Sequence, residues 1–223
     1  MEYQIEGKLA QSVRLTMKEG EECWASRGSL MALDQGVRWK LKVQGGIGGA
    51  GRRMLSGEGM SLILIEGVAN EGEVILSSNQ PGKVIAWDLD DSPALTTRGS
   101  FIGAFGQSVE IDVRVARRAG AALFGGAGLF LQRLSGQGLA FIHGAGDFIE
   151  YRLDAGQSIL VSTGNLAAFG DSVDYDIQRV GGLRRIFFGG EGLFMTRLTG
   201  PGRVLLQSLK RVSARAPAQR RAE

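Results

Sequence analysis

The sequence predicts an all-β fold made of three similar multi-stranded units, and a repeated glycine-rich segment is the first observation behind this prediction. The segment reads GGEGLFMTRLTGPG at 189–202, GGAGLFLQRLSGQG at 125–138 and, more faintly, SGEGMSLILIEG at 56–67. In each copy two glycines flank one variable residue, an apolar run follows, and a turn closes on glycine: Gly67, Gly136 and Gly200. Glycine makes up 35 of the 223 residues, roughly twice its usual share, which indicates many tight turns between short strands.

A second observation is the regular spacing of further glycines. Gly28, Gly99 and Gly164 precede the three glycine boxes at closely similar distances. This self-similarity indicates three homologous units, which we place at about 1–81, 82–155 and 156–209, followed by a basic tail at 210–223. One such unit is marginally stable alone. We therefore expect a single all-β domain, 1–209, whose units pack around a pseudo-threefold axis as a β-barrel or prism and so cover their open sheet edges.

The third observation is the alternation of apolar and polar residues at corresponding places in the units. It is clearest in SVEIDVRV at 108–115 and recurs in RWKLKV at 38–43 and SVDYDI at 172–177. A period of two predicts half-buried strands.

Neighbouring short strands are expected to form hairpins. The apolar runs inside the second and third boxes, 130–134 and 194–198, would pair with the residues that follow them. A further pair is expected from 148–153 and 157–162, around the turn Asp154-Ala155-Gly156.

The basic character of the chain is concentrated at its C-terminus. The formal net charge is +3, but the tail 210–223 holds five of the 26 basic residues and one of the 23 acidic residues. The remaining body is close to neutral, which argues against an extended basic face for nucleic acid. A single cysteine, no signal or transit pattern and no long apolar segment lead us to expect a cytoplasmic protein without a membrane span.

Arginine pairs beside the glycine boxes are the most suggestive candidate site. Successive backbone N–H groups of a glycine loop can form an anion-binding nest, and arginines bind phosphate or carboxylate in a bidentate way. Solvated loop ends, or ion pairs across a subunit interface, are the commoner role for such arginines. The candidate anion-binding residues are Arg117, Arg118, Arg184, Arg185, Gly126, Gly128, Gly190 and Gly192.

The sequence offers no converging catalytic or metal-binding set, so we expect no enzymatic activity, no catalytic residue, no metal and no cofactor. His143 is the single histidine, and its counterpart in the third unit is Gln207, which favours a structural hydrogen-bonding role. Cys23 is expected to be a small buried apolar residue. The acidic run at 88–91 lacks the spacing of a calcium loop, and the GIGGAG string at 46–51 lacks the helix that a dinucleotide site requires.

The strings FGDSVDYDIQRVGGL and IFFGGEGLFMTRLTGPGRVLLQS resemble the altered-inheritance-of-mitochondria family, which is linked to mitochondrial biogenesis. The resemblance extends over about 1–209 and is most specific in the third unit. It implies a β fold of three pseudo-symmetric parts, similar to that of the tryptophan RNA-binding attenuator protein, and it implies that members of the family often assemble as trimers. It implies no established enzyme chemistry, and RNA binding would follow by analogy with the fold alone.

Taken together, these observations lead us to expect a non-enzymatic β scaffold or binding protein that forms a homo-oligomer, with a trimer favoured. The alternative is a protein that binds RNA, DNA or another anionic ligand through the arginine pairs and the basic tail.

Overall fold

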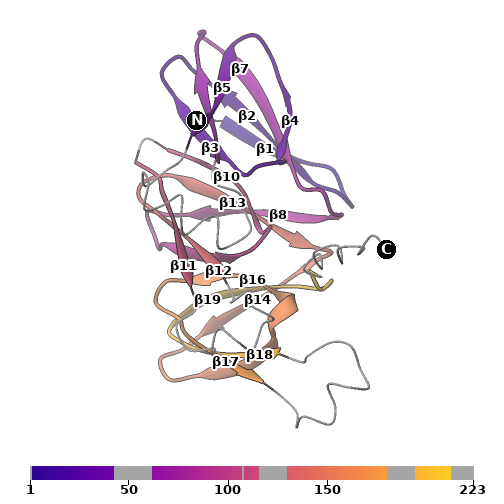
Figure 1. Cartoon of the computed structure of the whole chain (residues 1–223), viewed down its shortest axis with the longest axis vertical. Helices are drawn as coiled ribbons and strands as arrows, with labels where there is room; N and C mark the ends of the chain where they lie inside the picture. The colour runs from indigo at the N-terminus through magenta and orange to yellow at the C-terminus, as the bar shows by residue number, and fades with distance from the viewer. Residues whose placement is uncertain (1, 43–61, 107, 116–129, 180–193, 212–223) are drawn as a thin grey trace, which may run out of the picture.

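The computed structural model describes residues 2–42, 62–106, 108–115, 130–179 and 194–211 (Figure 1). These residues form antiparallel β-strands and one short 3-10 turn, η1 (Thr163–Asn165), and they contain no α-helix. The predicted all-β class is therefore confirmed.

The strands fall into three consecutive sets. The first set is β1 (Glu2–Glu6), β2 (Ser12–Met17), β3 (Glu22–Ala25), β4 (Leu30–Leu33), β5 (Val37–Lys42), β6 (Leu62–Gly67) and β7 (Gly72–Ser77). The second set is β8 (Gly82–Asp88), β9 (Ala94–Thr97), β10 (Phe101–Phe105), β11 (Glu110–Val115), β12 (Phe130–Ser135) and β13 (Leu139–Ala145). The third set is β14 (Phe148–Leu153), β15 (Ser158–Ser162), β16 (Leu166–Gly170), β17 (Asp174–Arg179), β18 (Phe194–Thr199) and β19 (Gly202–Gln207).

Six strands of each set pair in one recurring order. In the first set the two three-stranded arrangements are β5-β6-β3 and β2-β7-β4; the second set has β11-β12-β9 and β8-β13-β10, and the third has β17-β18-β15 and β14-β19-β16. The same irregularity of register also recurs, at Met31 in β4, Ile102 in β10 and Ala167 in β16. Corresponding positions in the three sets can therefore be assigned from strand pairing.

The sets are joined in series by two strand pairings. β3 pairs with β10, and β9 pairs with β16, so that three-stranded arrangements of neighbouring sets merge into two six-stranded sheets. The first set lies at one end of the long axis, the second in the middle and the third at the opposite end (Figure 1). A four-stranded sheet with β4 at its edge and a three-stranded sheet with β15 at its edge remain at the two ends.

Several expected pairings differ from those in the structure. β12 and β13, expected as a hairpin, lie in different sheets, and so do β18 and β19. β14 and β15 are also separated: β14 pairs with β19 and β15 with β18. The chain thus crosses between sheets at these short turns. The pairing of β14 groups it with the third set, one strand before the boundary expected near 156.

The described sheets are open, so the expected closed barrel is not what these residues form. A sheet closes when its two edge strands pair, whereas in the described strands β5 does not pair with β8 and β11 does not pair with β14. The pseudo-threefold axis expected from the sequence stays a prediction.

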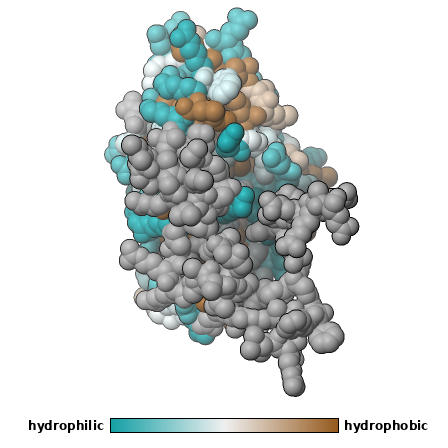
Figure 2. Space-filling model, in the orientation of Figure 1, coloured by the Kyte–Doolittle hydropathy of each residue, from teal (hydrophilic) through white to brown (hydrophobic). Residues whose placement is uncertain are grey.

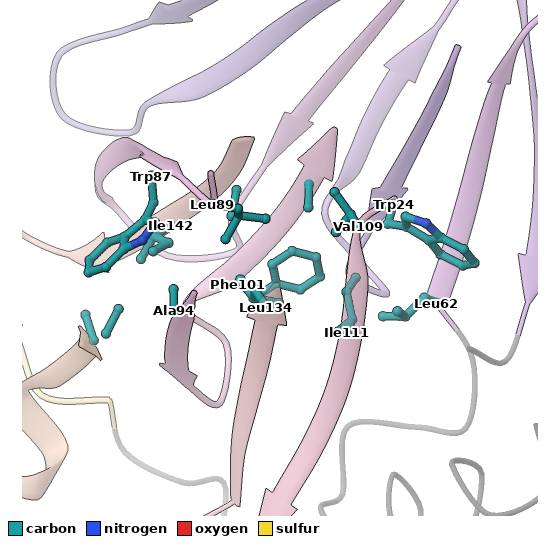
Figure 3. Close-up of a cluster of buried hydrophobic side chains, with 14 of the residues drawn as sticks. Trp24, Leu62, Trp87, Leu89, Ala94, Phe101, Val109, Ile111, Leu134 and Ile142 are labelled. Atoms are coloured by element: carbon teal, nitrogen blue, oxygen red, sulfur yellow. The ribbon is translucent and has the colours of Figure 1, made fainter. Parts of the chain in front are cut away.

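Buried apolar side chains cross the boundaries between the sets. One cluster brings Trp24 and Leu62 of the first set together with Phe101 and Leu134 of the second (Figure 3), and it continues to Leu205 of the third. A second cluster joins the first two sets and a third joins the last two. Burial of this shared apolar surface stabilises the sets as one body.

The three glycines that close the repeated segment lie against backbone. A Cβ atom on Gly67 would overlap the carbonyl oxygen of Lys18, and the same holds for Gly136 with Ser108 and Gly200 with Asp154. Glycine is required here because a strand end approaches another segment too closely for any side chain.

We expect Gly67→Ala to lower the free energy of unfolding by about 2 kcal/mol or more, because backbone must move to relieve the overlap. Gly164→Ala is the control, since the nearest atoms to its added Cβ lie at 3.6 Å, and its cost should stay below about 1 kcal/mol. Urea unfolding of both variants measures the difference. Equal midpoints for the two variants would contradict the proposed overlap.

Candidate functional site

Two strands, one at each end of the molecule, are sheet edges although their counterparts at the internal joints pair with a strand of the neighbouring set. We call residues 30–34 the β4 edge and residues 158–162 the β15 edge. In the described part of the chain, β4 pairs on one side with β7, and β15 pairs on one side with β18. The outer side of each strand therefore presents backbone N–H and C=O groups that can pair with another strand.

Leu33 shows how the β4 edge differs from its counterparts. Pairing with β7, β13 and β19 makes Leu33 equivalent to Ala104 and Phe169. Those two residues are fully buried at the joints between sets, whereas Leu33 is 37% exposed. Figure 2 shows apolar residues at the surface of this end of the molecule.

Leu160 shows the same difference on the β15 edge. Pairing with β6, β12 and β18 makes Leu160 equivalent to Trp24 and Leu95. Both equivalents are buried, whereas Leu160 is 47% exposed. At the internal joints, Trp24 lies opposite Ala104 and Leu95 lies opposite Phe169. Leu160 and Leu33 thus correspond to the two members of these cross-strand pairs. In a single molecule, however, they lie at opposite ends and do not pair with each other.

Met31 adds to the apolar character of the β4 edge. It occupies the position of the register irregularity and is 69% exposed, while its equivalents Ile102 and Ala167 are buried. Burial of each such side chain contributes on the order of 1 kcal/mol. The two edges therefore present exposed apolar side chains beside backbone groups that can pair with a further strand.

A hydrogen-bond network surrounds the single histidine, His143. The Arg211 guanidinium donates from Nη2 to Nδ1 of His143 at 2.7 Å and to the His143 carbonyl at 2.9 Å. It also donates from Nε to Oε1 of Gln207 at 3.0 Å, and the Gln207 amide donates to the Gly164 carbonyl at 3.0 Å. Since Nδ1 of His143 accepts a hydrogen bond, the proton of the neutral ring lies on Nε2.

The surroundings of His143 keep it neutral. Burial and, to a smaller extent, the nearby Arg211 charge lower the pKa of His143 to about 4, against the opposing effect of the Gln80 backbone. The ring is fully buried. Its contacts are those of a structural residue that connects β13 with the C-terminal segment.

The residues proposed from the sequence as an anion site, the arginine pairs and the box glycines, lie outside the described residues; they are Arg117, Arg118, Arg184, Arg185, Gly126, Gly128, Gly190 and Gly192. The GIGGAG string at 46–51 also lies outside them. Anion binding by these residues stays a prediction from the sequence.

Other candidates from the sequence have structural surroundings. Cys23 is buried, and burial raises the pKa of its thiol to about 12, which disfavours the reactive thiolate. Asp88 accepts the backbone N–H of Asp90 in a turn. Within the described ranges, no group of three or more potential metal-binding residues occurs and no helix is long and apolar enough to cross a membrane.

Leu33, Leu160 and Arg211 were not identified from the sequence. The apolar pattern of the two leucines matches that of their buried counterparts, so residue type alone gives no signal. The available signal was positional: in a linear series of similar units, the first and the last each lack one neighbour.

The burial of His143 predicts a specific acid sensitivity. The unfolded chain takes up a proton on this histidine near its usual pKa of 6.5, whereas the folded chain resists protonation until about pH 4. Stability is therefore lost as the pH falls from 6.5 to 4, by an amount on the order of 3 kcal/mol. His143→Gln, which copies the residue at the equivalent position in β19, should remove this part of the pH dependence.

Urea unfolding of both proteins at several pH values between 6.5 and 4 measures the effect. Carboxyl groups contribute equally to the two proteins, so the difference between their slopes reports on His143. Parallel curves would show that the histidine titrates alike in the folded and unfolded chains.

Comparison with known proteins gives the family. The family model described as Mitochondrial biogenesis AIM24 matches residues 3–209. An uncharacterised protein of Streptococcus pyogenes serotype M6 is 27% identical over 207 residues, which cover 88% of this chain and 81% of that protein. A crystal structure of a Streptococcus pyogenes protein covers 94% of both chains with a TM-score of 0.77 at 23% identity, a similarity that shows the fold. The chain belongs to the AIM24 family of mitochondrial biogenesis proteins.

Proposed function

We propose that this protein is a non-enzymatic scaffold that assembles with copies of itself, through its open strand edges, into a head-to-tail trimer. One observation carries the proposal: positions that are buried at both internal joints are exposed at the two ends of the molecule. We further infer that the three strand sets are copies of one β module, and that contact between molecules repeats the contact between modules.

The pairing rule of the internal joints specifies the contact. β15 of one copy pairs antiparallel with β4 of the next, with Leu160 opposite Leu33, Val161 opposite Ala32 and Ile159 opposite Asp34. Because the two edges differ, the contact is head-to-tail, and such contacts generate closed rings or open filaments. A closed trimer pairs every copy at both ends and leaves neither edge open.

Two features support a scaffold over an enzyme. The single histidine is held within the packing by Arg211, and the single cysteine is buried with a raised pKa. Binding of RNA or another anion remains the alternative expected from the arginine pairs and the tail. It would show as an affinity that falls steeply with added salt.

The proposed contact predicts the effect of a charge on either edge. Leu160→Lys or Leu33→Lys would place an ammonium group in the buried cross-strand pair, so each variant should have the mass of one 23.8 kDa chain. Leu41→Lys on β5 is the matched control, since Leu41 is 54% exposed and belongs to neither the β4 edge nor the β15 edge. Light scattering coupled to size exclusion measures the masses. An unchanged mass for Leu160→Lys would overturn the proposal.

Mixing the two edge variants tests the head-to-tail geometry. The Leu33→Lys protein keeps an intact β15 edge and the Leu160→Lys protein keeps an intact β4 edge. An equimolar mixture should therefore form a heterodimer and stop there, because the remaining two edges both carry a lysine. Native mass spectrometry of one isotopically labelled variant identifies the pair. If like edges paired with each other, each variant alone would form a homodimer and mixing would add no new species.

A further inference from the structure

The internal joints contain a second contact, and we propose that its counterpart between molecules is blocked by the C-terminal segment Ser208–Arg211. In this inference, which rests on the proposed self-assembly, Ala10 of one copy docks beside Ala145–Asp147 of another. The C-terminal segment occupies that place in the single chain and limits association until it moves away.

The first joint shows the second contact directly. Gly82, at the start of the second set, donates its N–H to the Leu9 carbonyl at 2.8 Å and accepts from the Gln11 N–H at 3.0 Å. These bonds form a parallel bridge between Ala10 and Gly82. Gly82 is thus hydrogen-bonded by Leu9 and Gln11. These two residues flank Ala10, which is the counterpart of Gly82 in the first set.

The second joint repeats this arrangement. Gly146, at the start of the third set, donates its N–H to the Pro81 carbonyl at 3.1 Å and accepts from the Lys83 N–H at 3.1 Å. A parallel bridge links Gly82 with Gly146. Each joint therefore contains one parallel bridge: Ala10 with Gly82 at the first joint and Gly82 with Gly146 at the second.

Around Gly146, the same two backbone groups belong to Ala145 and Asp147, which flank Gly146 as Pro81 and Lys83 flank Gly82. The Ala145 carbonyl accepts the Leu209 N–H at 3.1 Å, and the Asp147 N–H donates to the Ser208 hydroxyl at 2.9 Å. The C-terminal segment thus takes the place that a following set takes at both internal joints.

The occupant that fits this place in an assembly is Ala10 of the next copy. It is the equivalent of Gly82 and Gly146, it lies on the surface, and it belongs to the same end of the molecule as the β4 edge. Leu9 and Gln11 direct their groups toward Gly82, so alternation along the backbone directs the Ala10 N–H and C=O the opposite way. A copy that pairs through β4 would bring Ala10 toward Ala145–Asp147.

Arg211 holds the C-terminal segment in place. Its backbone N–H donates to the Gly164 carbonyl at 3.1 Å, and its side chain binds His143 and Gln207. Gly164, His143 and Gln207 are all uncharged, and burial lowers the pKa of Arg211 to about 10. A half-buried cation bound to neutral groups keeps part of its desolvation cost, so the segment is held in a form that can be displaced.

The test compares the association of intact chains by sedimentation equilibrium. Arg211→Ala should strengthen association about tenfold, because two backbone hydrogen bonds become available to the next copy. Lys210→Ala is the control, since it removes the same charge from an exposed neighbouring residue, and it should associate as the unchanged protein does. Ser208→Ala, which removes the hydroxyl that Asp147 binds, is a milder second variant and decides the question if Arg211→Ala fails to fold.

A double variant identifies the docking residue. Ala10→Pro removes the N–H that would bind the Ala145 carbonyl, so Ala10→Pro combined with Arg211→Ala should lose the tenfold gain. Association that is unchanged or weaker in Arg211→Ala, or a gain that survives Ala10→Pro, would overturn the inference. Leu160→Lys separates it from the proposed function: if that variant dissociates while Arg211→Ala gains nothing, self-assembly stands and the blocking role of the C-terminal segment falls.

Discussion

The structure depends on two short strand pairings, β3 with β10 and β9 with β16. Each takes an edge strand of one set and an edge strand of the next and turns two small sheets into one six-stranded sheet. The shared sheets bring Trp24 and Leu95 into the interior. The same pairings place the sets in series, and a series necessarily has two ends. The exposed leucines of β4 and β15 are the consequence of this arrangement.

The sequence predicted the strands well because their signal is local. Val109, Ile111 and Val113 alternate with polar residues and are buried as a period of two requires. The closing glycines were predicted as turn residues, and the structure adds the reason: Gly67, for instance, leaves no room for a side chain beside Lys18. Local periodicity and steric exclusion both act over a few residues, so both can be recognised in a single chain.

Strand partners were not predictable in the same way. β12 and β13 are separated by a short turn, which favours a hairpin, yet β12 pairs with β11 and β9 while β13 pairs with β10 and β8. Which strands pair depends on which apolar faces meet across the interior. Leu134 of β12 and Ile142 of β13 belong to one buried cluster, although their strands lie in different sheets. This information lies in contacts between distant segments. The open edges escaped prediction for a similar reason, because Leu33 and Phe169 have the same apolar character and differ in whether another set follows. The arginine boxes lie outside the described residues, and their role still rests on the sequence.

The two ends of the series are covered unequally, and this asymmetry restricts how copies can join. In the first set, β1 pairs with the outer side of β2. The strands equivalent to β2, which are β8 and β14, have no such partner from their own set. Tyr3 of β1 also packs on Phe141 of the second set, with ring centroids 5.3 Å apart. At the other end the C-terminal segment binds Ala145 and Asp147. Each end therefore has an exposed strand, β4 or β15, together with a neighbouring segment whose backbone groups are partly covered. In the proposed contact, the β4 edge and the β15 edge meet in the register of the internal joints. An uncapped series of β modules would offer several edges to any exposed strand, which is the usual route to aggregation. In the proposed assembly, β1 and the C-terminal segment therefore restrict the ways in which one copy can approach the next.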